Sequence, residues 1–266
     1  MIRTDKRLPL SEAAALVKPG DTLALGGLTL YRRPVAFVYE LLRRAPPPDN
    51  LTLLCYTASY ESDLLVGAGL VKRVRSCYFG FEAFGLAPMF TEAAQRGAIE
   101  VIEESEASLA FGLRATLAGI GFMPARAWLG TDLPRLRPDV RTIRDPYTDE
   151  ELMAFPAVSA DVAVIHAVQA DPFGNAILNN NLGVDLELAM AAKTVIVTAE
   201  EIVPPHSLTR ADMPGPTVTA VAHAPRGAWP TSCHPLYPMA GGEILKYLDV
   251  NSPETFAAYI KTTLSR

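Results

Sequence analysis

Residues 22–27 read TLALGG, a short apolar run that ends in two glycines. A helix is expected before this run, over 12–18 with Ser11 as its N-cap, because the segment 19–21 (PGD) would stop it. A second helix is expected after it, opening at Pro34, since proline suits the first helical position. An apolar strand between two helices is typical of a buried, parallel strand.

The same alternation continues along the chain. Further apolar strands are expected over 51–56, 74–79, 99–103, 161–168, 194–198 and 217–223, and further helices over 107–118, 184–193 and 252–264. Strands separated by helices predict an α/β fold with an open, mostly parallel sheet and helices on both faces. The proline-punctuated stretch 134–149 is interpreted as an excursion within one domain that spans residues 1–266.

Composition narrows the class of protein. With 49% hydrophobic and 20% charged residues, the 266-residue chain can bury a sizeable core without metals or disulfides. A net charge of −5 argues against nucleic-acid binding. The segment 1–10 does not resemble a secretory signal, and no apolar run is long enough to span a membrane. Three cysteines fit no metal pattern, so we expect a cytoplasmic protein without a metal.

The first candidate site is the loop after the strand over 22–25. Ligands of open α/β sheets bind at the carboxyl ends of the strands. Paired glycines, Gly26 and Gly27, let a ligand approach the backbone and could leave N–H groups for an oxyanion or carbonyl, with Tyr31 and Arg32 close by. A simple tight turn is the alternative, and the residues alone favour it.

The second candidate site is the acidic segment that follows the strand over 99–103. Glu103, Glu104 and Glu106 flank Ser105, and crowding plus burial would raise one pKa toward that of a general base or nucleophile. An exposed acidic helix start, favoured by the helix dipole, is the alternative and is preferred on these residues alone.

The third candidate site is the turn that includes Gly174 and Asn175, after the strand over 161–168. The amides of residues 179–181 could hydrogen-bond a ligand, or the loop could simply satisfy its own backbone. His166 lies within an apolar run and is interpreted as a core histidine rather than an acid or base. Motifs for a nucleophile elbow, a Walker loop or a dinucleotide fold are absent from the sequence.

Four blocks of this chain, in order, resemble the A-type component of family I coenzyme A transferases. They are 19–28 with Arg32 and Pro34, then 121–132, 160–176 and 195–203. Pro19, Leu28 and Arg32 depart from the family signature, which has a glycine at the last of these places. The resemblance implies a fold of the NagB/RpiA/CoA-transferase type, a B-type partner in an α2β2 assembly, and acyl-CoA as substrate with no other cofactor.

In that family the catalytic glutamate belongs to the B-type partner and becomes a glutamyl-CoA thioester. The resemblance therefore implies substrate-binding residues in this chain: Gly26, Gly27, Tyr31, Arg32, Ser105, Gly174 and Asn175.

One branch of the family is closer at some positions. Residues 32–38, 71–74, 105–106 and 112–113 resemble the alpha subunit of the steroid ring-opening acyl-CoA hydrolase of cholesterol catabolism. Its catalytic glutamate falls on Glu106, although the alignment could shift to Glu103 or Glu104. Three interpretations follow: one half of a transferase, a carbon–carbon hydrolase with Glu106 as base, or a non-enzymatic sugar-phosphate-sensing module of the same fold.

Overall fold

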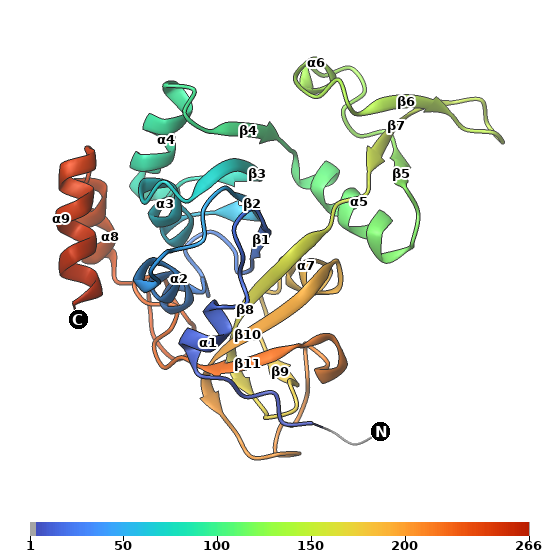
Figure 1. Cartoon of the computed structure of the whole chain (residues 1–266). Coiled ribbons are helices and arrows are strands. Elements are labelled where there is room, and N and C mark those ends of the chain that lie inside the picture. The colour runs from blue at the N-terminus through green and yellow to red at the C-terminus, as the bar shows by residue number, and fades with distance from the viewer. Residues whose placement is uncertain (1–3, 266) are drawn as a thin grey trace.

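A computed structural model describes residues 4–265 and is built around one large sheet (Figure 1). Its eight strands follow the order β11-β10-β8-β1-β2-β3-β4, with β9 beside β8. Only β9 runs antiparallel to its neighbour, so the mostly parallel sheet predicted from the sequence is confirmed. The strands are β1 (Thr22–Leu25), β2 (Leu51–Ala58), β3 (Val71–Phe79), β4 (Glu100–Glu103), β8 (Ala160–Ala170), β9 (Ala176–Ile177), β10 (Ala192–Ile202) and β11 (Ala220–His223).

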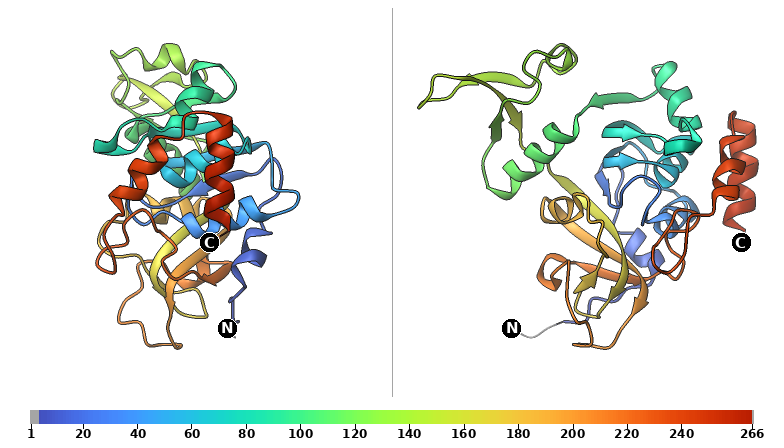
Figure 2. Two further views of the ribbon diagram at one scale, coloured as in Figure 1. Left: turned by 90° about the vertical axis from the view of Figure 1, so that its left-hand side faces the viewer. Right: turned by 180° about the vertical axis from the view of Figure 1, so that it is seen from behind.

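Helices cover both faces of this sheet, as expected (Figures 1 and 2). The largest hydrophobic core lies on the face covered by α1 (Leu10–Ala14), α2 (Val35–Arg43), α3 (Tyr60–Gly67), α4 (Pro88–Gln95), α8 (Gly241–Leu248) and α9 (Pro253–Leu264). A second core lies beneath α5 (Glu106–Leu117) and α7 (Asp185–Met190). Because apolar side chains are buried on both faces, the central strands are mainly apolar rather than alternating between apolar and polar residues.

A three-stranded antiparallel sheet projects from the body as an arm (Figures 1 and 2). The strands of the arm are β5 (Phe122–Ala125), β6 (Arg141–Arg144) and β7 (Glu151–Pro156), in the order β5-β7-β6. The arm also contains the short helix α6 (Leu133–Leu136), which lies between β5 and β6 in the chain. The arm has a core of its own, formed by Trp128, Val140, Met153 and Phe155. The excursion expected over 134–149 is therefore part of a wider structured unit.

Some expected boundaries were wrong. The first helix spans 10–14 rather than 12–18, and the helix expected over 184–193 ends at Met190, because Ala192 and Lys193 already belong to β10. The late strand begins at Ala220, after a short 3-10 turn over Gly215–Thr217. No helix among residues 4–265 is both long and apolar enough to cross a membrane. Residues 1–3 of the stretch considered as a possible secretory signal lie outside the described residues.

Candidate active site at the carboxyl edge of the sheet

The Gly26-Gly27 loop leaves the carboxyl end of β1 in the middle of the sheet. The Gly26 N–H donates to the carbonyl of Val164 at 2.9 Å, and the Gly27 N–H donates to Oδ1 of Asp185 at 2.8 Å. Neither N–H is free to bind a substrate oxygen, so that expectation was wrong. Gly27 has φ +86°, and a Cβ there would lie 2.7 Å from backbone oxygens, so the loop requires glycine for its own shape.

Arg32 is fully buried beneath this loop rather than open to a ligand. Its guanidinium pairs with Asp185 at 2.5 Å and donates to the carbonyls of His166 at 2.6 Å and Asn181 at 3.0 Å. Its φ of +54° is unusual for a residue with a side chain. Direct substrate binding by Arg32 is therefore ruled out by its burial, and the side chain instead fixes three segments to one another.

Arg33 forms a second buried ion pair on the other side of the loop. It contacts Glu61 at 2.5 Å, and both side chains are fully buried. It also donates to the carbonyls of Gly27 at 2.9 Å and Thr57 at 2.8 Å. Burial works against the charge, but Glu61 holds the pKa of Arg33 above its ordinary value. The loop is therefore held from both sides by charged groups whose pairing the sequence does not reveal.

The acidic segment at the end of β4 splits into three environments. Glu104 is buried between Arg75 at 2.7 Å and Arg137 at 2.8 Å. Ser105 caps α5, and its hydroxyl also accepts a hydrogen bond from the Trp128 indole at 2.7 Å. Because these groups already have partners, Glu104 and Ser105 act as structural residues in this chain.

Glu106 is the first residue of α5 and is exposed, as is Glu103. Among the described residues, the side-chain carboxylate of Glu106 forms no hydrogen bond or ion pair. The burial expected for a general base is therefore not provided by this chain, and the catalytic role of Glu106 stays a prediction. Tyr56 and Cys77, both half-buried, interact electrostatically with Glu106. The pKa of Tyr56 is raised, first by burial and then by Glu106. The pKa of Cys77 is raised to about 12 by burial, then by Glu104 and Glu106.

The turn that contains Gly174 and Asn175 lies away from the glycine loop. It follows Ala170, six residues beyond Val164 on β8, or about 20 Å along a strand. Asp171 accepts the N–H groups of Phe173 at 2.9 Å and Asn175 at 3.0 Å, and the Asn175 amide bonds to Asp171 and Gly215. Because the loop satisfies its own polar groups, the substrate-binding assignment of Gly174 and Asn175 is not supported by their position.

A hollow of about 210 Å³ opens beside the glycine loop instead. It is lined by Tyr31, residues 179–181 and His234. Tyr31 is thus the predicted binding residue that lines this hollow. The three asparagines stand out in the sequence, but nothing there places them against Tyr31, which lies almost 150 positions earlier in the chain.

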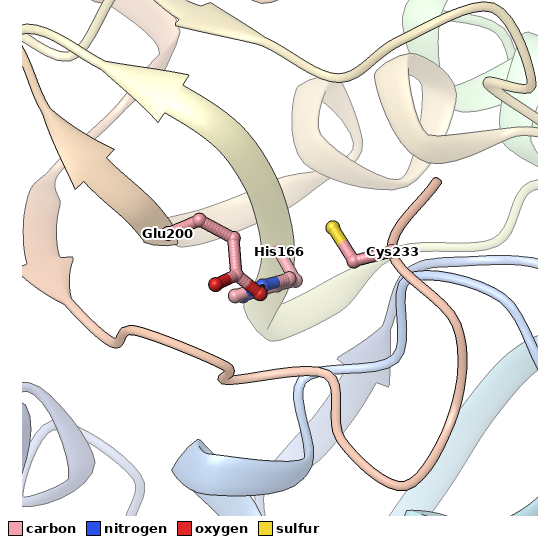
Figure 3. Close-up of side chains that lie close together, drawn as sticks. All are labelled: His166, Glu200 and Cys233. Atoms are coloured by element: carbon pink, nitrogen blue, oxygen red, sulfur yellow. Dashed lines mark hydrogen bonds and ion pairs between the residues drawn. The ribbon is translucent and has the colours of Figure 1, made fainter. Parts of the chain in front are cut away.

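Next to this hollow, a hydrogen-bonded cluster joins the carboxyl ends of β8 and β10 to the loop that follows β11 (Figure 3). His166 bonds to Thr198 at 2.8 Å and to Glu200 at 2.9 Å, and Glu200 also accepts from Tyr237 and from the Arg226 N–H. Burial lowers the pKa of His166, so the neutral ring donates from Nε2 to the carboxylate. His166 is buried in the core, as its sequence context predicted.

The ligand atoms of His166, Glu200 and Cys233 lie within 4.8 Å of one another, a grouping that could hold a metal (Figure 3). Both ring nitrogens are already hydrogen-bonded, however, and burial together with Glu200 raises the pKa of Cys233 to about 12. A metal would need the thiolate, so the cluster is better described as a structural network that anchors the loop over 224–239.

Comparison with known proteins identifies the family to which this chain belongs. Residues 8–224 match the family described as Coenzyme A transferase. The A-type chain of the 3-oxoadipate CoA-transferase of Pseudomonas knackmussii is 38% identical, over 86% of this chain and 83% of the relative. The crystal structure of glutaconate coenzyme A-transferase from Acidaminococcus fermentans superposes with a TM-score of 0.89 at 31% identity, over 97% of this chain and 88% of that one.

A third relative, the cholesterol ring-cleaving hydrolase IpdA subunit of Rhodococcus jostii, is 34% identical over 85% of this chain and 80% of the relative. The chain belongs to the coenzyme A transferase family. It corresponds to the A-type component of that family and is an enzyme of it, so the non-enzymatic sensing module is set aside.

Proposed function

We propose that this chain is the A-type half of a cytoplasmic coenzyme A transferase that moves CoA between carboxylic acids. The observation that carries the proposal is that the buried carboxylates around the site are already engaged. Among the described residues beside the glycine loop and the start of α5, these are Asp185, Glu61 and Glu104, and each forms an ion pair with arginine. None of these buried carboxylates is free to act as the nucleophile, and exposed Glu106 lacks a surrounding pocket in this chain. We therefore assign the nucleophilic glutamate to a B-type partner, in an α2β2 assembly.

The reaction then needs no additional cofactor. The partner's glutamate attacks the thioester carbonyl and expels the CoA thiolate, which leaves a mixed anhydride between the donor acid and the glutamate. The thiolate then attacks the glutamyl carbonyl and releases the donor acid, so that a glutamyl-CoA thioester remains. An acceptor carboxylate passes through the same two steps in reverse order, which forms the product acyl-CoA and frees the glutamate. The contribution of this chain is a rigid wall beside the reacting groups. Because the Gly26-Gly27 loop is fixed by Arg32 and Arg33, it needs little reorganisation when the substrate binds.

A second candidate function is hydrolysis of a carbon–carbon bond in a cyclic acyl-CoA, with Glu106 as general base. It is favoured by the unpaired position of Glu106 beside Tyr56 and Cys77, and by the similarity to a ring-cleaving hydrolase. In this case a partner would have to cover Glu106, because desolvation is needed to raise the pKa of a carboxylate toward neutrality.

Trapping the covalent intermediate separates the two functions. The chain is co-purified with its B-type partner, incubated with succinyl-CoA, reduced with borohydride and digested for mass spectrometry. A transferase should carry the reduced glutamate on the partner chain, in the wild type and in Glu106→Gln alike. Glu103→Gln is the matched control, since Glu103 is also exposed and lies at the same end of β4.

The hydrolase function predicts the opposite pattern: no trapped thioester, and loss of ring cleavage in Glu106→Gln but not in Glu103→Gln. Turnover by the chain without any partner would contradict the proposed division of the active site between two chains.

A further inference from the structure

A cavity of about 500 Å³ lies between α2, α8, α9 and the loop over 224–239. Helices α8 and α9 form one edge of the body (Figures 1 and 2). The cavity is larger than the hollow of about 210 Å³ beside the glycine loop, and its volume lies within the range of about 300–1,000 Å³ that small-molecule sites occupy. It therefore has room for a ligand of moderate size.

Aromatic side chains from three segments line this cavity. They are Tyr39 of α2, Trp229 of the loop over 224–239 and Tyr259 of α9. The hydroxyl of buried Tyr60 bonds to that of Tyr39 at 2.8 Å and to that of Tyr259 at 2.6 Å, so the two lining tyrosines are fixed relative to each other. Aromatic walls that are held in place suit a flat, apolar ring.

The charges around the cavity favour an anion. Arg43 and Lys246 line it together with one carboxylate, that of Glu243, whereas the whole chain has a net charge of −5. Lys246 pairs with Glu243 at 2.6 Å, and Arg43 pairs at 2.6 Å with Glu40 and donates to the Leu264 carbonyl at 3.3 Å. A guanidinium has five N–H donors, so Arg43 can bind a further carboxylate without losing these partners.

Two more donors line the cavity without a protein partner. The hydroxyl of Thr263 and the indole N–H of Trp229 bond to none of the described residues. Trp229 is half-buried, and the N–H of a buried tryptophan usually has a hydrogen-bond partner. The oxygens of a carboxylate ligand would provide the missing acceptors.

The cavity is separate from the carboxyl edge of the sheet. Helix α2 joins the parallel strands β1 and β2, so it runs back from that edge, and from Val35 to Arg43 it covers about 12 Å. A ligand at Arg43 would therefore leave the acyl-CoA site open. Trp229 nevertheless belongs to the same loop as Ser232, whose carbonyl accepts the Arg32 N–H at 2.7 Å, so an occupant contacts a segment that also holds the glycine loop.

We propose that this cavity is an accessory site for a small aromatic carboxylate. The ring lies against Tyr39, Trp229 and Tyr259, and the carboxylate is bound by Arg43. The inference goes beyond the proposed function and does not depend on which reaction the assembled enzyme catalyses.

Isothermal titration calorimetry of the enzyme assembled with its B-type partner tests the proposal, with 2-naphthoate as the probe. The analogue 2-naphthamide keeps the ring system and removes the charge, whereas octanoate keeps the charge and removes the ring. We expect 2-naphthoate to bind once per A-type chain and each analogue to bind at least about fivefold more weakly, because it lacks either the charged hydrogen bonds or the aromatic contacts. Saturating coenzyme A and succinate should leave the affinity for 2-naphthoate unchanged.

Two variants locate the binding. Arg43→Met keeps the apolar stem and removes the charge, and Trp229→Leu removes one aromatic wall, so each should raise the Kd of 2-naphthoate at least about fivefold. Arg96→Met is the matched control and should keep the wild-type Kd. Arg96 is also exposed and pairs with a nearby glutamate, Glu92, but it does not line the cavity.

Four results would each overturn the inference: no binding of 2-naphthoate, equal binding of 2-naphthamide, displacement by coenzyme A and succinate, or a wild-type Kd in Arg43→Met. None of them bears on the trapped glutamyl thioester, so the accessory site and the proposed function are tested separately.

Discussion

Replacing Arg33 with methionine should destabilise the protein more than any surface change. The substitution keeps most of the apolar stem but removes the guanidinium, which leaves Glu61 fully buried with only the hydroxyls of Ser62 at 2.6 Å and Ser59 at 3.3 Å. The carbonyls of Gly27 and Thr57 also lose a donor.

Breaking one side of a buried ion pair costs roughly 3–5 kcal/mol, because an uncompensated charge remains. The double variant Arg33→Met, Glu61→Leu removes that charge and leaves neutral groups short of a partner, namely the two carbonyls and the Ser62 hydroxyl, at a loss of about 1–3 kcal/mol each at most. We therefore expect the double variant to be more stable than Arg33→Met alone, with a coupling free energy of about 2 kcal/mol or more.

Urea unfolding of the wild type, both single variants and the double variant gives this cycle directly. Fluorescence is a suitable signal because Trp229 lies in the body and Trp128 in the arm. A loss below about 1 kcal/mol for Arg33→Met, or strictly additive effects, would show that the buried pair does not hold the loop.

Gly27→Ala should lower the free energy of unfolding by more than Gly20→Ala, measured by urea titration, since both have positive φ but only Gly27 meets backbone oxygens at 2.7 Å; equal effects would refute the crowding. Burial raises the pKa of Asp63 to about 6, so its contribution to stability is present below its ordinary pKa and is lost as pH rises through about 6. Relative to Asp63→Asn, wild-type stability should fall by about 3 kcal/mol across that window, and parallel pH profiles would contradict this. Cys77 and Cys233, with pKa values raised to about 12, should resist iodoacetamide at pH 8 until urea unfolds the protein, as read by mass spectrometry; rapid native labelling would exclude these environments.

The central sheet could be predicted because its strands have a clear local pattern. Runs such as 51–58 and 160–170 are mainly apolar and are buried along most of their length, and polar residues such as Asn50, Ser59 and Asp171 mark their ends. The arm could not be predicted in the same way, because β5 and β6 have only exposed and half-buried positions and carry proline or arginine. The helix α3 was missed because it is buried nearly all round and has no polar face to give it a period.

The candidate site shows a similar division. The glycine loop and the acidic helix start were located from local sequence alone. What occupies their polar groups depends on residues far away: Asp185 lies 158 positions from Gly27, and Arg137 lies 33 positions from Glu104. No spacing rule links such pairs, so the sequence could suggest free N–H groups at Gly26 and Gly27 while the fold had already used them.

The separate core of the arm has a consequence for hydrogen–deuterium exchange. Trp128 and Phe155 pack edge to face at 5.1 Å within a small cluster of their own, whereas the body is held by much larger cores. Amide protons of β5, β6 and β7 should therefore exchange through local opening, well before those of β1 and β8. The hydrogen bond from Trp128 to Ser105, the N-cap of α5, couples local opening of the arm to the first turn of that helix. A partner that slows amide exchange in the arm should therefore also slow the exchange of the amide of Glu106.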